Sequence, residues 1–345
     1  MAPRRAPHPY TAAGVRIFSG IQPTGRKHLG NYIGAIRQYV DGQERGDPAI
    51  YSIVDLHATS VAYDPKTLPR HVYDTTAMLL AAGLDPGRCI LFRQSDVKEH
   101  AELAWLLTSV TAHGDLNRMH QFKDKSAQQR ELVSAGLFLY PVLQAADVLA
   151  HRAEEVPVGD DQRQHIELTR DIAERFNATY GEVLVVPEHR ITEVGARIMD
   201  LHDPFRKMST TGSEERGVIF VDDDEATIVK KLQSAVTDSG SEVRRGADKP
   251  GITNLIDIVG AIREVSPEVV EEEFSDSGYG DFKTAVAEEV AGYLAPVRER
   301  YDELRADDEA LEATLTQGAE AARTTASETL ADVRAAMGVG PSPGA

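Results

Sequence analysis

VRIFSGIQPTGRKHLGNYIGAIRQYV (residues 15–40) is the stretch that decides the fold. Its β-rich start, VRIFS, runs into a turn rich in glycine and proline, and Leu29, Gly30 and Asn31 then open a helix. The N–H groups and the dipole of that helix would face whatever lies at the turn, which suits a phosphate group. Gly30 permits close approach, and His28 and Asn31 add hydrogen-bond donors. An ordinary strand-to-helix turn explains the same residues equally well.

The alternation of strand and helix patterns continues to about residue 205. Further β-rich runs occupy 49–55, 89–95 and 183–187, and helical patterns lie near 66–82, 99–112, 126–135, 139–152 and 160–176. This alternation predicts βαβ units and a parallel, Rossmann-like doubly wound sheet of the α/β class. The later stretches have helical spacing and few strand signals, which predicts an all-helical second domain: 224–236, 252–264, 267–274, 281–304 and 308–336.

We therefore expect four segments. A flexible tail at 1–14 precedes the sheet domain at 15–205, and a loop with the helical domain occupies 206–307. A last helix and a frayed tail fill 308–345, and this helix could pack back on the sheet domain.

The composition limits the kind of protein. With 345 residues, of which 41% are hydrophobic and 27% charged, the chain can bury the core of two domains. No stretch approaches the apolar length of a membrane helix, and the N-terminus lacks the apolar core of a signal peptide, so we expect a cytoplasmic protein with no membrane partner. The single cysteine, Cys89, excludes an internal disulfide and a multi-thiolate metal site, so we expect no structural metal.

Negative charge is concentrated in the last third of the chain. The net charge is −18, and residues 211–345 contribute −16 of it, with 13 Lys and Arg against 29 Asp and Glu. Contact with a nucleic acid would therefore depend on local basic groups, because phosphates must be neutralised by nearby cations. The candidates in this region are Lys230, Lys231, Arg244, Arg245 and Lys249.

Polar side chains also occur in places where they need partners. Asp55 and His57 follow a predicted strand, at the edge where open α/β sheets bind ligands, although a packed histidine is the commoner explanation. Tyr140, Gln144 and Asp147 share one stripe of an apolar helix. A buried carboxylate costs several kcal/mol without hydrogen bonds, so Asp147 either pairs inside the protein or accepts a donor from a ligand.

Two loops complete the set of motifs. VPVGDDQRQH (156–165) enters a helix, where Asp160 or Asp161 would serve equally as an N-cap. RKMSTTGSEE (206–215) has the composition of a mobile anion-binding loop or of a polar linker.

Taken together, the motifs resemble class I aminoacyl-tRNA synthetases and, within that class, the bacterial tryptophanyl-tRNA synthetase family. His28-Leu29-Gly30-Asn31 matches the HIGH signature, and Lys207-Met208-Ser209-Thr210-Thr211 takes the position of the KMSKS loop. FSGIQPTG, YPVLQAADVL, VPVGDDQRQHIELTRDIAERFN, GARIM and SAVTDS are also close to that family, and the similarity runs from about Arg16 to Gly338. The resemblance implies a homodimer that takes ATP with Mg²⁺, L-tryptophan and tRNA(Trp), and a helical domain that binds the anticodon.

The resemblance also implies a role for each matching residue. ATP would be held by Gln22, Pro23, Thr24, His28, Gly30, Asn31, Gly159, Asp160, Asp161, Ile198 and the loop residues Lys207, Met208, Ser209, Thr210 and Thr211. Catalysis would involve Lys207, Ser209, Lys125, His28 and Asn31, with Lys125 and Lys207 neutralising the leaving pyrophosphate. Tryptophan would be held by Asp147, which accepts the indole N–H, and by Tyr140, Gln162, Gln22, His57, Phe18, Val158 and Gln144.

Two positions depart from the family pattern. Thr210 replaces the second lysine of the KMSKS loop, and Gln144 stands where bacterial relatives often have Met. Thr210 keeps open the alternative of a paralogue that binds tryptophan or ATP without charging tRNA. A tyrosyl enzyme is disfavoured by the segments around Asp147, and a small-molecule nucleotidylyltransferase would not need so long a helical domain.

Overall fold

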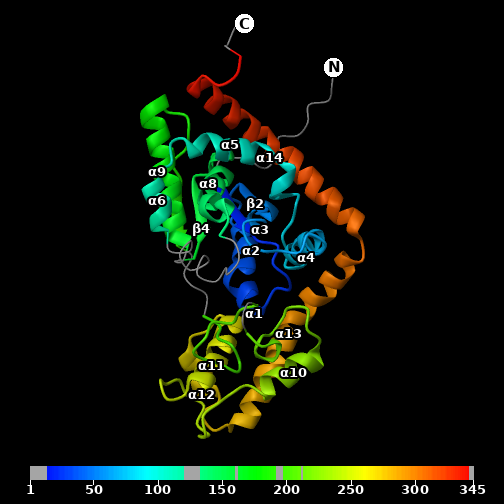
Figure 1. Cartoon of the computed structure of the whole chain (residues 1–345). Coiled ribbons are helices and arrows are strands. Elements are labelled where there is room, and N and C mark those ends of the chain that lie inside the picture. The colour runs from blue at the N-terminus through cyan, green and yellow to red at the C-terminus, as the bar shows by residue number, and fades with distance from the viewer. Residues whose placement is uncertain (1–13, 120–132, 160–161, 192–196, 211–212, 342–345) are drawn as a thin grey trace.

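The computed structural model describes residues 14–119, 133–159, 162–191, 197–210 and 213–341. Figure 1 shows a sheet domain at one end, a helical domain at the other, and two long helices along one side, α13 (Tyr279–Arg305) and α14 (Asp308–Met337). Within the described residues, no helix has both the length and the apolarity that crossing a bilayer requires.

Five parallel strands form the sheet in the order β3-β2-β1-β4-β5. Their bounds are β1 (Ile17–Ile21), β2 (Ala49–Ile53), β3 (Ile90–Arg93), β4 (Glu155–Val158) and β5 (Glu188–Ile191). The chain builds outward from β1 to β3 and then adds β4 and β5 on the other side of β1. The strand order therefore reverses between β1 and β4, which is where open α/β sheets bind ligands. The predicted Rossmann-like α/β class is confirmed.

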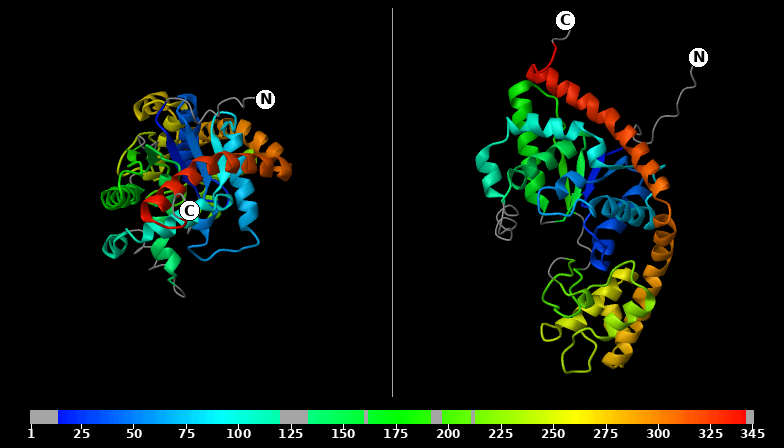
Figure 2. Two further views of the ribbon diagram at one scale, coloured as in Figure 1. Left: turned by 90° about the horizontal axis from the view of Figure 1, so that it is seen from above. Right: turned by 45° about the vertical axis from the view of Figure 1, so that its right-hand side comes forward.

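Helices cover both faces of the sheet (Figure 2). They are α1 (Leu29–Asn31), the π-helix η2 (Tyr32–Ile36), α2 (Arg37–Glu44), α3 (Asp55–Ala58), α4 (Leu68–Ala81), η3 (Gln94–Asp96), α5 (Glu99–Thr108), α6 (His113–Arg118), α8 (Ala135–Ala150) and α9 (Arg163–Tyr180). α8 packs between α5 and α9 over one apolar core, and a second core lies under η2 and α4. Burial on both faces explains why β2, AIYSI, is entirely apolar apart from one serine.

The second domain is helical, as predicted. It comprises η5 (Glu215–Gly217), α10 (Glu225–Gln233), α11 (Pro250–Arg263), α12 (Pro267–Glu273) and α13. Local signals start these helices: Asp224 caps α10 by accepting the N–H of Thr227, and Pro250 and Pro267 occupy first positions where no N–H is needed.

The last helix returns to the sheet domain. α14 packs on β3, α5 and α8, and an added Cβ at Gly318 would overlap the carbonyl group of Leu91. Glu312 of α14 pairs with Arg93 at 2.8 Å. α14 therefore covers the edge strand β3, which would otherwise expose apolar surface and unpaired backbone groups.

One predicted strand is wrong. Residues 183–187 form no strand, because the side chain of Asn177 accepts the N–H groups of Val183 and Leu184 and donates to the carbonyl oxygen of Leu184. The strand lies just after this run, at Glu188–Ile191, where it pairs with β4. A side chain thus takes the backbone hydrogen bonds that a neighbouring strand would have supplied.

The two domains are joined at the turn that decides the fold. The guanidinium of Arg26 pairs with Asp222 at 2.9 Å and with Asp223 at 2.7 Å, and the N–H of Leu29 donates to the carbonyl oxygen of Ile219. One apolar cluster continues from the sheet domain into the helical domain. The start of α1 is therefore held by contacts with both the sheet domain and the helical domain.

Candidate active site

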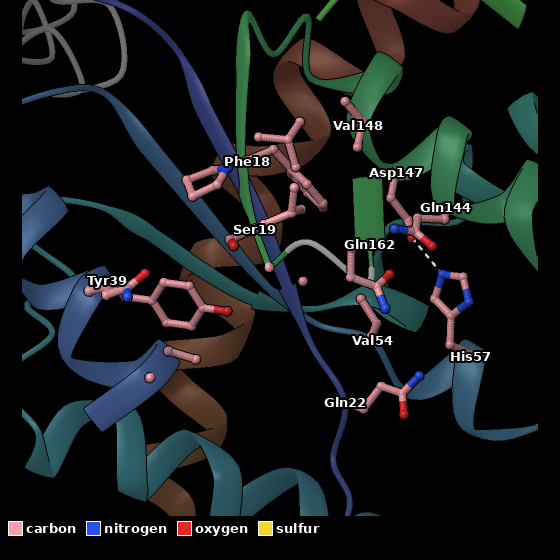
Figure 3. Close-up of a pocket in the computed structure, with 18 of the residues that line it drawn as sticks. Phe18, Ser19, Gln22, Tyr39, Val54, His57, Gln144, Asp147, Val148 and Gln162 are labelled. Carbon is pink, nitrogen blue, oxygen red and sulfur yellow. Dashed lines mark hydrogen bonds and ion pairs between the residues drawn. The ribbon is translucent and has the colours of Figure 1, made fainter. Parts of the chain in front are cut away.

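A pocket of about 400 Å³ opens at the carboxyl ends of β1 and β4, where the strand order reverses. It is lined by Phe18, Ser19, Gly20, Gln22, Gly34, Ala35, Gln38, Tyr39, Val54, His57, Tyr140, Gln144, Asp147, Val148, Val156, Pro157, Val158, Gly159 and Gln162. Figure 3 shows Asp147 and His57 facing each other at one side of this pocket. Every residue that the family resemblance assigned to tryptophan is in this lining set.

Asp147 is the buried charge of the pocket. The residue is 1% exposed, and its carboxylate accepts from His57 Nε2 at 2.8 Å and from Gln94 Nε2, which lies 2.8 Å from both oxygens. His100 Nδ1 lies 3.0 Å from its Oδ1. Burial alone would raise the pKa of this carboxyl group, but hydrogen bonds from His100 and His57 hold the pKa well below its usual range. The pocket therefore contains an ionised hydrogen-bond acceptor.

Gln94 and His100 were not among the sequence candidates. Gln94 follows β3 directly, so its place at the carboxyl end of a strand was a usable signal. His100 lies inside α5, and nothing in the pattern of α5 indicates that it reaches α8. Both side chains are fully buried.

The remaining walls of the pocket combine aromatic and polar groups. Phe18 stacks on His151 with ring centroids 5.6 Å apart, and Tyr140 approaches the edge of His57. Tyr140 Oη lies 2.8 Å from His165 Nε2, and burial raises the pKa of Tyr140 to about 12. Tyr140 is therefore a neutral phenol near pH 7, which can both donate and accept a hydrogen bond.

A second group of candidates meets at the start of α1. His28 Nδ1 accepts the N–H of Asn31 at 3.2 Å, and the Asn31 side chain accepts the N–H of His28 at 3.4 Å, so the two residues cap the helix reciprocally. A Cβ on Gly30 would lie 3.1 Å from His28 Nδ1 and 3.5 Å from Ile198 Cβ. Glycine at this position lets Ile198 and His28 approach the helix.

The protonation state of His28 follows from its surroundings. Burial, with the nearby charges of Lys207 and Lys27, lowers its pKa to about 4. The ring is therefore neutral near pH 7, and since Nδ1 accepts from Asn31, the proton is on Nε2. His28 thus offers one N–H donor beside the positive end of a helix, an arrangement that suits a phosphate oxygen.

Residues 207–210 of the KMSTT segment lie near the same turn, through Ile198. Met199 and Lys207 form an antiparallel bridge, and the N–H of Met208 donates to the carbonyl oxygen of Ile198 at 3.0 Å. Met208 is buried in the apolar core, whereas Lys207 and Thr210 are exposed. Met208 therefore anchors the loop in the core, and the side chain of Lys207 is exposed at the surface.

Other candidates have separate places in the structure. Gln22, Pro23 and Thr24 form the turn after β1, with Gln22 also lining the pocket, and Gly159 lies at the end of β4. Ser209 follows Met208 in the loop. Lys125, Asp160, Asp161 and Thr211 lie outside the described residues, as does most of the helix predicted at 126–135.

The proposed basic contacts of the helical domain need correction. Lys231 is buried and pairs with Asp223 at 2.7 Å, and Lys249 is buried beside Asp238 and Tyr279. Neither ammonium group is available to a phosphate. Lys230, Arg244 and Arg245 are exposed, although carboxylates within the domain pair with both arginines: Glu242, Asp248 and Asp257.

Comparison with known proteins shows which class of protein this chain belongs to. Residues 11–295 match the family model described as tRNA synthetases class I (W and Y). The chain is 50% identical to tryptophan–tRNA ligase 2 of Streptomyces avermitilis over 318 residues, which cover 91% of this chain and 94% of that protein. It is 46% identical to the tryptophan–tRNA ligase of Mycobacterium leprae, covering 97% and 99% of the two chains. The chain therefore belongs to the tryptophan–tRNA ligase family of the class I tRNA synthetases.

Solved structures agree with this assignment. The tryptophanyl-tRNA synthetase of Mycoplasma pneumoniae superposes with a TM-score of 0.85 at 35% identity, covering 95% of this chain and 98% of that one. The enzyme of Campylobacter jejuni, solved with ADP and tryptophan, has a TM-score of 0.82 at 34% identity and covers 94% and 100%. The sequence-based prediction of the family is confirmed.

Proposed function

We propose that the pocket beside Asp147 binds tryptophan and that the α1 turn with the KMSTT loop binds ATP. As a member of its family, the chain is an ATP-dependent ligase that activates L-tryptophan and transfers it to tRNA(Trp). The observation that carries the assignment of the site is the ionised carboxylate of Asp147, which is buried at one side of a pocket with aromatic and polar walls at the switch point of the sheet.

The chemistry of the tryptophan side chain fits this pocket. An indole ring has one polar feature, an N–H donor, and the Asp147 carboxylate is an acceptor. Phe18, His57 and Val158 supply walls for the ring, and Gln144 lies beside it. In this proposal the ammonium and carboxylate groups of the amino acid are held by Tyr140, Gln162 and Gln22.

ATP would extend from the end of β4 to the α1 turn. Gly159 and Ile198 would contact the ribose and adenine, together with Asp160 and Asp161. His28 Nε2, the side chain of Asn31 and the N-terminal end of α1 would face the phosphates, and Lys207 would lie on their other side. Mg²⁺ would arrive with ATP, since magnesium usually binds substrate phosphates and keeps much of its water.

The reaction needs positioning and charge neutralisation more than acid–base catalysis. A carboxylate oxygen of tryptophan attacks the α-phosphorus, the bond to the bridging oxygen breaks, and pyrophosphate leaves with that oxygen. A ribose hydroxyl of the terminal adenosine of tRNA then attacks the acyl carbon and releases AMP. Lys207 and Lys125 would neutralise the charge that develops on pyrophosphate.

Tryptophan-dependent ATP–pyrophosphate exchange, followed by charging of tRNA(Trp), tests the proposal. We expect exchange with tryptophan, little with tyrosine, and subsequent charging. Tryptophan binding without exchange would favour the non-charging paralogue, and tyrosine-dependent exchange would contradict the assignment of the pocket.

The loop lysine that is missing at position 210 leads to a prediction. Thr210 is exposed, so a lysine can be accommodated there without repacking. We expect Thr210→Lys to accelerate adenylate formation by up to about a hundredfold, since one transition-state cation contributes of order 3 kcal/mol. Single-turnover kinetics would measure the step, with Thr324→Lys at an exposed position of α14 as the control. An unchanged rate would show that another cation already acts at this position.

Gln144 gives a second prediction. Its amide lies at the pocket, and Met at this position would pack on an indole ring without burying polar atoms. We expect Gln144→Met to lower KM for tryptophan several-fold, about 1 kcal/mol, and to weaken the acceptance of ring-hydroxylated tryptophans. Steady-state exchange with tryptophan and 5-hydroxytryptophan would measure both. Identical constants in the two proteins would show that Gln144 has no role in selectivity.

We also propose that the protein is a homodimer, as the family resemblance implies. Trp105 on α5 is 75% exposed, which is unusual for so large an apolar side chain and is typical of a surface that a partner covers. Light scattering should give twice the chain mass of 37.7 kDa. A mass equal to that of one chain would contradict this proposal.

A further inference from the structure

Two side chains reach Asp147 from behind the pocket. Gln94, from η3, and His100, from α5, are both fully buried, and neither lines the cavity. Each therefore approaches the carboxylate from outside the cavity. His57 is the donor that lines the pocket itself.

These donors occupy most of the acceptor capacity of the carboxylate. A carboxylate has roughly four acceptor sites on its two oxygens. Gln94 Nε2 lies 2.8 Å from both oxygens, His100 Nδ1 lies 3.0 Å from Oδ1, and His57 Nε2 lies 2.8 Å from Oδ2. Counted with Gln94 as one donor shared between the two oxygens, three donor groups surround the carboxylate. The direction from which a further N–H can reach it is therefore set by where Gln94 and His100 hold the group.

Both rear side chains are themselves held in place. Gln94 Oε1 accepts the N–H of Leu56 at 3.0 Å, which fixes its amide so that Nε2 points to Asp147. His100 Nε2 lies 2.9 Å from His151 Nε2, and its ring packs edge-on against Phe92. The donors cannot turn away without breaking these contacts.

The titratable groups around Asp147 are few. His57 comes from α3, His100 from α5 and His151 from the end of α8, while Tyr140 and His165 lie one contact further out. Burial and the neighbouring His100 lower the pKa of His151 strongly, so this ring is neutral and can share one proton with His100.

We propose that Gln94 and His100 are positioning residues that select the indole N–H, by holding the Asp147 carboxylate as an acceptor in one orientation. This inference rests on the proposed assignment of the pocket to tryptophan. A substrate with an N–H donor gains a hydrogen bond to a buried anion, and an isostere without the donor leaves that anion unsatisfied. A site of this kind discriminates between substrates with and without the N–H donor more strongly than a site that recognises shape alone.

Discrimination against the benzothiophene analogue of tryptophan, in which sulfur replaces the N–H group, tests the proposal. We expect His100→Leu to reduce the ratio of kcat/KM for tryptophan to that for the analogue at least tenfold, with KM for ATP unchanged. His100→Asn places an amide donor near the position of Nδ1, so it should keep most of the discrimination. A general loss of packing would lower kcat/KM for both substrates equally, and His100→Asn would not restore it.

The dependence of KM on pH gives an independent measurement. Without His100, the Asp147 carboxyl group loses a hydrogen bond that stabilises its ionised form, so its pKa rises. The protonated group is a donor and faces the indole N–H with the wrong polarity. KM for tryptophan in His100→Leu should therefore rise as the pH falls, over a range in which the native profile is flat.

Gln94→Glu provides a second variant that does not depend on the folding of His100→Leu. It keeps an acceptor for Leu56 but places a second carboxylate next to Asp147, and two such groups cannot both stay ionised. The pH-dependent rise in KM should then extend to neutral pH.

An unchanged discrimination ratio and a flat pH profile in folded His100→Leu or Gln94→Glu would overturn the role of these residues. Failure of the native protein to exchange pyrophosphate with tryptophan would instead overturn the assignment of the pocket.

Discussion

Asp147→Asn should lower kcat/KM for tryptophan by about a thousandfold, or roughly 4 kcal/mol, because a buried charge and its hydrogen bonds are lost together. The asparagine amide has one acceptor oxygen and one NH₂ group. That NH₂ group would face one of the donors of His57, Gln94 or His100, each now at about 3 Å or less from a carboxylate oxygen. Pyrophosphate exchange at varied tryptophan concentrations would measure the loss.

A second aspartate provides the control for this substitution. Asp332 on α14 pairs with Arg152 at 2.9 Å, but its side chain is 60% exposed, so the pair contributes only about 0.2–1 kcal/mol. Asp332→Asn should leave exchange unchanged. Nucleotide affinity should be retained in Asp147→Asn, and a tryptophan KM equal to the native value would contradict the assigned role of Asp147.

Gly30→Ala has the second-largest expected effect, and it changes the proposed ATP site rather than the tryptophan pocket. The new Cβ would lie 3.1 Å from Nδ1 and 3.2 Å from Cε1 of His28, on a ring that is held between α1 and the core. The ring must shift by a few tenths of an ångström, which strains its hydrogen bond with Asn31 and moves its Nε2 donor. We expect about a hundredfold loss in the activation rate, close to 3 kcal/mol. Single-turnover kinetics would give the rate, and calorimetry should show unchanged tryptophan affinity.

Gly292→Ala is the matched control for the added methyl group. Gly292 lies on the exposed side of α13, and a Cβ there meets no atom within 4 Å. Activity should be unchanged, and the free energy of unfolding should increase by about 0.5–1 kcal/mol, since alanine suits a helix interior better than glycine. An equal loss of activity in both variants would rule out the contact with His28 as the cause.

The general course of the fold follows from sequence patterns. The β-rich runs at 49–55 and 89–95 and the helical spacing after residue 211 predict elements that the structure contains. The strand predicted at 183–187 is displaced to Glu188–Ile191, because hydrogen bonds from the Asn177 side chain are not visible in hydrophobic periodicity. β4 was also missed, because proline and glycine made its residues look like a loop.

The candidate site was predictable where its residues sit in motifs. Phe18 lies in β1 and Gln22 follows it, Tyr140 and Asp147 lie on one stripe of α8, and Val158 ends β4. A doubly wound sheet therefore brings them to one pocket. The donors behind Asp147 come from elements that meet it through tertiary packing. The burial of Lys231 and Lys249 likewise depends on partners that helical spacing does not indicate, Asp223 for Lys231 and Asp238 with Tyr279 for Lys249.

The return of α14 to β3 affects how the sheet domain folds during synthesis. Phe92 of β3 shares its core with Ala319, Ala322 and Ala326, which leave the ribosome long after β3. Until then the sheet has been made but one edge of it has no cover, and the nascent chain exposes apolar surface of the kind that recruits chaperones or other chains. A stop codon that removes α14 would therefore yield an aggregation-prone sheet domain rather than a smaller active one.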